Sequence, residues 1–100
     1  MFDRNSDCEY KYELKQTNQF KKDLKLAKKQ HKNIEALLYV VDKLARGENL
    51  EEKYRDHDLH GNYINCRECH ISPDWLLVYR VYEDVLILVL SRLGSHSELY

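Results

Sequence analysis

Residues 64–91 read INCRECHISPDWLLVYRVYEDVLILVLS, and this stretch decides the fold. It holds three runs rich in β-branched, aromatic and other apolar residues, separated by short groups of turn-forming residues. The runs cover residues 64–71, 75–82 and 85–91, and the turns are Ser72-Pro73-Asp74 and Glu83-Asp84. Connections this short predict an antiparallel meander of three strands. The last two runs are apolar on both faces, which is typical of central strands that are covered on both sides.

Upstream of this meander, the periodicity predicts one more strand and two helices. Residues 10–14 alternate apolar and polar side chains, as a short half-buried strand does. Thr17 is a suitable N-cap for a first helix. Apolar residues recur at helical spacing over residues 34–45, and Gly47 follows as a candidate C′ residue of a second helix. The two helices are expected to form a hairpin.

The expected architecture is therefore α+β, with the element order β-α-α-β-β-β. An antiparallel-rich sheet of about four strands is packed on the helix hairpin. Residues 50–62 lose the periodicity and become charged, which predicts a long and partly irregular loop. A chain of 100 residues is expected to form one domain, here residues 10–100, after a disordered or loosely attached tail at residues 1–9.

The composition indicates a folded protein of the cell interior. It is 43% hydrophobic and 33% charged, with few glycines and one proline. Residues 1–9 lack the basic start and apolar core of a secretory signal, and the longest apolar run, residues 85–90, is too short to cross a membrane. We expect a cytoplasmic location without membrane contact. Three cysteines are an odd number, which favours reduced thiols over disulfides.

Lysine is concentrated in residues 15–32, which carry seven lysines and one acidic residue, Asp23. The whole chain has a net charge of −1, so the remainder is net negative. A lysine-rich helix face is most often a solvated surface, but it is also what a phosphate-binding surface needs. The candidate residues on the first helix and the turn after it are Lys21, Lys22, Lys25, Lys28, Lys29 and Lys32.

Three of the five histidines stand between His57 and His70, and His96 follows near the C-terminal end of the sequence. Imidazole is the side chain that changes charge near neutral pH, so several histidines with a nearby acid, Asp74, are suited to acid and base catalysis. The other common use of such residues is metal binding. His31 and His60 have no patterned partner and are expected at the surface.

Cys66-Arg67-Glu68-Cys69-His70 matches the C-x-x-C-H pattern of covalent haem attachment. We reject haem because the motif falls in an expected strand of a cytoplasmic protein. Zinc is a stronger rival, since the histidines and cysteines from His57 to His70 exceed the four ligands of a structural site. In a strand, however, Cys66 and Cys69 point to opposite faces. Parity places Glu68 beside His70 and makes Cys69 a core residue.

Four segments together resemble the YafQ branch of the RelE toxin superfamily. They are YRDHDL at residues 54–59, RECHI at 67–71, PDWLLVY at 73–79 and RLGSHSELY at 92–100. The most specific parts are H-x-x-P-D-W-x-L-x-Y, which begins at His70, and the terminal R-x-G-[ST]-H-x-x-L-[FY]. The resemblance spans about residues 10–100 and implies a RelE-like fold.

The resemblance also implies an activity and roles for residues. It implies the toxin of a type II toxin-antitoxin pair, a ribosome-dependent endoribonuclease that cuts mRNA in the A site through 2′-hydroxyl attack, without a metal or other cofactor. His96 matches the general acid. The matched residues for base catalysis and substrate placement are His57, His70 and Asp74. Trp75 and Tyr100 match aromatic positions that stack on or support a base.

Charge and position suggest further contacts with RNA. Arg92, and more weakly Arg55, are candidates for balancing the charge of the phosphorane. The lysines of the first helix and its following turn are candidates for binding ribosomal RNA. The implied partners are a RelB/DinJ-like antitoxin, the 70S ribosome and mRNA, with operator DNA bound only through the antitoxin complex.

Two other functions remain open from the sequence. The same fold can act as an interaction module without nuclease activity, bound to its antitoxin or to another target. The gyrase-directed ParE-like branch typically lacks such a set of histidines, so His57, His70 and His96 argue against it. A structural zinc protein is the less favoured alternative.

Overall fold

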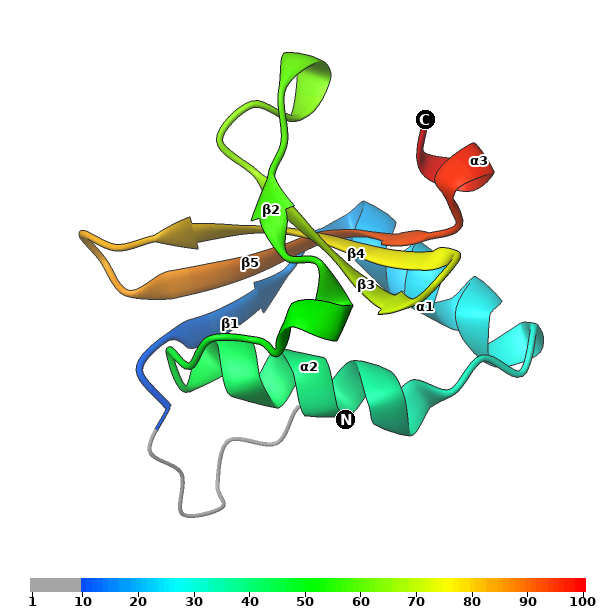
Figure 1. Ribbon diagram of the computed structural model, residues 1–100, viewed down its shortest axis with the longest axis horizontal. Helices are drawn as coiled ribbons and strands as arrows, with labels where there is room; N and C mark the ends of the chain where they lie inside the picture. The colour runs from blue at the N-terminus through cyan, green and yellow to red at the C-terminus, as the bar shows by residue number, and fades with distance from the viewer. Residues whose placement is uncertain (1–9) are drawn as a thin grey trace.

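The computed structural model describes residues 10–100, and the tail expected at residues 1–9 lies outside them. The elements in chain order, with η for a short 3₁₀ helix, are β1 (Glu13–Gln16), α1 (Asn18–Lys29), α2 (Ile34–Ala45), η1 (Glu52–Tyr54), β2 (His57–Asp58), η2 (Gly61–Tyr63), β3 (Arg67–Ser72), β4 (Trp75–Tyr82), β5 (Ile87–Gly94) and α3 (His96–Leu99) (Figure 1). Within this described part of the chain, every helix is too short or too polar to span a bilayer.

The strands form one sheet in the order β1-β5-β4-β3-β2. β3, β4 and β5 form the predicted antiparallel meander, β1 joins β5 in parallel, and β2 adds a two-residue antiparallel edge to β3. The predicted α+β class and the antiparallel-rich sheet are confirmed. The sheet has one strand more than expected because β2 is too short to show an alternating pattern in the sequence.

One face of the sheet is covered by α1 and α2, which together build the main core. Thr17 caps α1 as predicted, since its side chain accepts a hydrogen bond from the Phe20 N–H at 2.9 Å. Phe20 and Leu37 from the helices and Leu77 from β4 are among the fully buried side chains of this core. The amphipathic helices therefore cover one face of β4, and other segments of the chain cover the opposite face.

The opposite face carries a second and smaller apolar cluster. Leu76 and Val78 of β4 are buried there against Leu99 of α3, and Tyr63 from η2 packs at its margin. Figure 1 shows the loop that holds β2 and η2, and also α3, on the side of the sheet away from α2. Two separate segments thus border this face: His57 and His96 lie on them, and His70 lies on β3.

β4 has the predicted bounds, but β1 and β5 begin later along the chain than expected. β1 begins at Glu13 because the backbone N–H groups of Lys11 and Tyr12 donate to the carbonyl of Ala45 at 2.9 and 3.0 Å, so they are bound to the end of α2. β5 begins at Ile87 because Leu86 has a left-handed φ of 54°, which lengthens the turn before it.

Asp23 of α1 secures the edge of β5 beyond the reach of β1. β1 pairs with β5 only as far as Leu90, and the Leu93 N–H donates to Asp23 Oδ2 at 2.9 Å. The same oxygen accepts a hydrogen bond from Arg92 Nε at 2.9 Å, and the Asp23 side chain is only 9% exposed. The one acid of the lysine-rich helix is therefore a structural group.

Replacing Asp23 with alanine should destabilise the protein. It leaves the Leu93 N–H without its acceptor and the half-buried Arg92 without its charge partner, so we expect the free energy of unfolding to fall by about 1–3 kcal/mol. Urea denaturation measures the change. Lys22→Ala, at an exposed position of the same helix, is the matched control and should stay within about 0.5 kcal/mol of the parent. Equal loss in both variants would contradict this role of Asp23.

Candidate active site

The centre of the site is Glu68, a carboxylate that is only 4% exposed. Its Oε1 lies 3.3 Å from His57 Nε2 and 3.8 Å from His70 Nε2. The two imidazole rings are 6.2 Å apart between centroids. Glu68 and His70 share a face of β3, as their parity predicts, and β2 places His57 directly opposite Glu68 in the strand register. One buried carboxylate therefore holds two imidazoles.

Tyr100 links this group to the end of the fold. Its hydroxyl donates to Glu68 Oε2 at 2.5 Å, and its ring lies 5.0 Å from the ring of His96 and packs edge-on against Tyr63 at 5.5 Å. Burial, with the hydrogen bond to Glu68 as the next cause, raises the pKa of Tyr100, so the hydroxyl keeps its proton and remains a donor. Through Tyr100, His96 belongs to the same group as His57 and His70.

Arg67 of β3 anchors the segment that carries His57. Its guanidinium binds Asp56 Oδ2 at 3.2 Å and Asp58 Oδ1 at 2.7 Å, so the residues on both sides of His57 are tied to the sheet. Burial alone would lower the pKa of Arg67, but the hydrogen bonds and charge interactions with Asp56 and Tyr79 together outweigh it and raise the pKa. The hydroxyl of Tyr79 in β4 also donates to Asp56.

The tautomer of His57 is fixed by the backbone. Its Nδ1–H donates to the carbonyl oxygen of Arg55 at 2.6 Å, because a carbonyl can only accept. In the neutral ring, Nε2 is then the nitrogen that is free to take a proton, and it is the atom that faces Glu68.

His96 is presented by the N-terminus of α3. Ser95 and Glu98 form a capping box, in which the Glu98 side chain accepts the Ser95 N–H at 2.7 Å. Asp74, which was expected in catalysis, uses its carboxylate to accept the backbone N–H of His96 at 3.2 Å. Asp74 therefore ties the β3–β4 turn to the segment that carries His96.

Two predicted substrate-binding residues are engaged within the fold. Trp75 is 3% exposed in the core under the helices, so its ring cannot stack on a base in this conformation. Trp75 lies on the helix-side face of β4 together with Leu77 and Tyr79, as the alternation of side chains along a strand requires. Arg92 is bound to Asp23 at 2.9 Å, and this hydrogen bond is the main cause of its raised pKa. Its charge is already balanced within the fold.

The remaining candidates are at the surface. Arg55 is exposed and lies next to His57 in a left-handed conformation with φ of 49°. Lys32 is half-buried, and the other candidate lysines, Lys21, Lys22, Lys25, Lys28 and Lys29, are exposed. These exposed positions on α1 are compatible both with a solvated surface and with a surface that binds RNA phosphates.

Cys66 and Cys69, the two cysteines within residues 10–100, do not join the histidines. Cys69 is fully buried in the helix-side core, as predicted, and burial raises the pKa of its thiol. Cys66 packs on the other face beside Tyr63 and Leu76. Among residues 10–100, no group of three or more His, Cys, Asp or Glu side chains is arranged to hold a metal ion.

The sequence interpretation missed Glu68 and the network of Asp56, Arg67 and Tyr79. Glu68 had one available signal, because it shares a strand face with His70 and a carboxylate on a buried strand needs partners. The anchoring of Asp56 had none, since it joins three segments that are distant along the chain.

Comparison with known proteins agrees with this geometry. The family model described as "Bacterial toxin of type II toxin-antitoxin system, YafQ" matches residues 12–100. The mRNA interferase toxin YafQ of Escherichia coli strain K12 is 34% identical over 89 residues, which is 88% of this chain and 95% of that protein.

Solved structures give the same result. YafQ in the E. coli DinJ-YafQ complex has a TM-score of 0.83 and 33% identity, covering 90% of this chain and 98% of the other. A metal-bound toxin from Helicobacter pylori has a TM-score of 0.84 and 43% identity, covering 89% and 99%. The fold and the histidine group thus define a toxin of the RelE superfamily. More narrowly, the chain belongs to the YafQ family of toxins of bacterial type II toxin-antitoxin systems.

Proposed function

We propose that this YafQ-family toxin is a ribosome-dependent endoribonuclease that cuts mRNA in the A site through attack of the 2′-hydroxyl. The observation that carries the proposal is the union of His57, His70 and His96 around Glu68 and Tyr100 on one face of the sheet. Bases and acids for both proton transfers are thus gathered in one place. Two E. coli relatives bear the name mRNA interferase toxin.

The proposed reaction uses only side-chain acids and bases. His57 or His70 takes the proton of the 2′-hydroxyl, whose oxygen forms a bond to the adjacent phosphorus. The bond from phosphorus to the 5′-oxygen breaks, and the His96 imidazolium gives that oxygen a proton. The products are a 2′,3′-cyclic phosphate and a 5′-hydroxyl. Each of the two proton transfers contributes typically 10²–10⁴-fold to such rates.

Glu68 supports the base in this scheme. When an imidazole takes up the proton it becomes positively charged, and a carboxylate at 3.3 or 3.8 Å stabilises that form. The ring of Tyr100 is exposed, and we expect it to stack on a base of the bound strand. Arg55 is the cationic residue nearest in sequence to His57, and we expect it to balance the charge of the reacting phosphate.

The proposed partners are an antitoxin, the 70S ribosome and mRNA, in the cytoplasm. The DinJ-YafQ complex, which contains a relative of this chain, supports a RelB/DinJ-like antitoxin. Operator DNA is contacted only through the toxin-antitoxin complex in this scheme.

Primer extension on mRNA of translating ribosomes tests the activity. Cuts confined to the A-site codon, dependent on the ribosome and ended by 2′,3′-cyclic phosphate, are the expected result. A folded toxin that leaves this mRNA intact, yet binds an antitoxin, would establish the interaction module in place of the nuclease.

The lysine surface gives a separate prediction about ribosome binding. Replacing Lys21, Lys22, Lys25 and Lys28 with glutamate should weaken binding and flatten its dependence on salt, because fewer counterions are released from RNA phosphates. Sedimentation with ribosomes over a range of salt concentrations measures both. Lys25→Glu compared with Lys15→Glu, an exposed lysine of β1, gives a matched pair with the same charge change. Equal effects in this pair would reduce the helix face to a solvated surface.

A further inference from the structure

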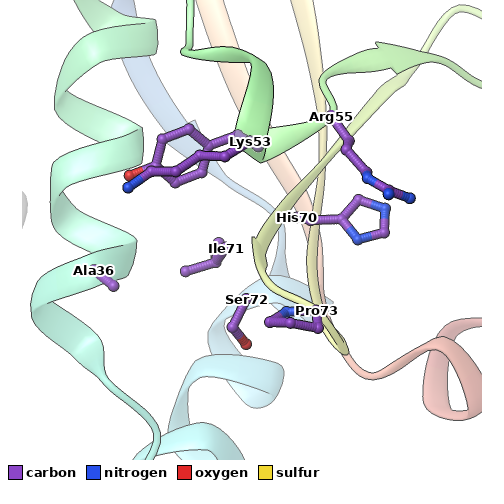
Figure 2. Close-up of a pocket in the computed structure, with 8 residues that line it drawn as sticks. Ala36, Lys53, Arg55, His70, Ile71, Ser72 and Pro73 are labelled. Carbon is purple, nitrogen blue, oxygen red and sulfur yellow. The ribbon is translucent and has the colours of Figure 1, made fainter.

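A pocket of about 600 Å³ lies between the first turn of α2, η1 and the β3–β4 turn. Its volume is within the range of about 300–1,000 Å³ that is typical of small-molecule sites. Figure 2 shows Lys53 reaching toward α2, with Ile71 and Pro73 of the β3–β4 hairpin across from it. Nothing in the proposed reaction yet uses this space.

The pocket shares lining residues with the active site. His70 lines the pocket and is also one of the two imidazoles next to Glu68. Arg55 lines it as well, and its carbonyl accepts the Nδ1–H of His57. A strand of RNA bound at the histidines would therefore pass next to this pocket. Tyr100 and His96 do not line the pocket and contact the group through Glu68.

The chemistry of the lining fits an anion that carries a flat apolar group. Lys53 and Arg55 supply positive charge, and the lining contains no carboxylate. Arg55 makes no salt bridge to any residue between 10 and 100, and Lys53 Nζ lies 5.2 Å from the ring centroid of Tyr54. Tyr54, Ile71 and Pro73 provide the apolar surface.

We propose that this pocket is a nucleotide subsite that holds the residue of the mRNA flanking the cut bond. Its base packs against Ile71, Pro73 and Tyr54, its phosphate meets Arg55 on the side of His70, and Lys53 adds positive charge at the end of the pocket next to α2. The inference rests on the proposed nuclease function. An acidic and apolar peptide has related chemistry. RNA is favoured because His70 lines both the pocket and the histidine group, and because the carbonyl of Arg55 binds His57.

The test fills the pocket and measures cutting on ribosomes programmed with a short mRNA. Ala36 lines the pocket from α2 and is half-buried, so Ala36→Phe occupies the space without touching the histidines. Losing one base contact should raise the KM roughly 5- to 50-fold with little change in kcat. The preference for the flanking base, measured across the four mRNA variants at that position, should disappear.

Lys53→Glu is a second pocket variant that changes only an exposed side chain. It still tests the subsite if Ala36→Phe folds poorly. Lys15→Glu, with the same charge change at the far edge of the sheet, is the control. Unchanged KM and flanking-base preference in both pocket variants, with the parent still active, would overturn the subsite and leave the nuclease standing. An inactive parent would instead refute the nuclease and the subsite together. Normal cutting with weakened antitoxin binding would assign the pocket to a peptide.

Discussion

Replacing His96 with alanine lowers the single-turnover rate of mRNA cutting about 10²–10⁴-fold, the usual contribution of a general acid. The leaving 5′-oxygen is a strong base, so it departs slowly unless a proton reaches it as the bond to phosphorus breaks. His96 is exposed at the start of α3, with its ring 5.0 Å from that of Tyr100, which is bound to Glu68. The variant therefore removes the proposed proton donor from a site that otherwise stays assembled.

The fold should survive this change, because His96 does not hold α3 in place. Leu99 is buried against Leu76, and the capping box of Ser95 and Glu98 is made without the imidazole. Asp74 binds the backbone of residue 96, which alanine retains. His60→Ala, at an exposed histidine outside the group, is the matched control. A rate for His96→Ala equal to that of this control would remove His96 from the mechanism.

The meander was predictable from sequence because its information is local. Short turns force β3, β4 and β5 into adjacent antiparallel positions, and β4 lies at residues 75–82 as predicted. β2 was not predictable in this way. β2 pairs with β3, and Arg67 binds Asp56 and Asp58 on either side of His57; both interactions depend on the folded sheet.

The candidate site shows the same division between local and tertiary information. Parity placed Glu68 and His70 on one face and Cys69 on the other, and the structure confirms this arrangement. The partner of Arg92 was not predictable from sequence, because Asp23 lies on a helix 69 residues earlier. A charged residue in an apolar strand indicates that a partner exists, but it does not identify the partner.

Glu68→Gln should lower kcat about 10²-fold and leave the KM nearly unchanged, because part of the contribution of base catalysis is lost. Glutamine has almost the shape of glutamate, and its carbonyl oxygen still accepts the hydroxyl of Tyr100. What it removes is the negative charge beside His57 and His70. The loss appears mainly in kcat because proton transfer puts positive charge on an imidazole in the transition state, where the carboxylate stabilises it.

Two further variants distinguish this electrostatic role from simple packing. Glu68→Asp restores the charge on a shorter side chain, so its kcat should lie between those of the parent and Glu68→Gln. Tyr100→Phe keeps the ring next to His96 but removes the hydroxyl that donates to Glu68, so its effect should be smaller than that of Glu68→Gln. If Glu68→Asp were as slow as Glu68→Gln while both melted at the temperature of the parent, the position of the carboxylate would matter more than its charge. A Glu68→Gln toxin as fast as the parent would show that the imidazoles take up the proton without help from this buried acid.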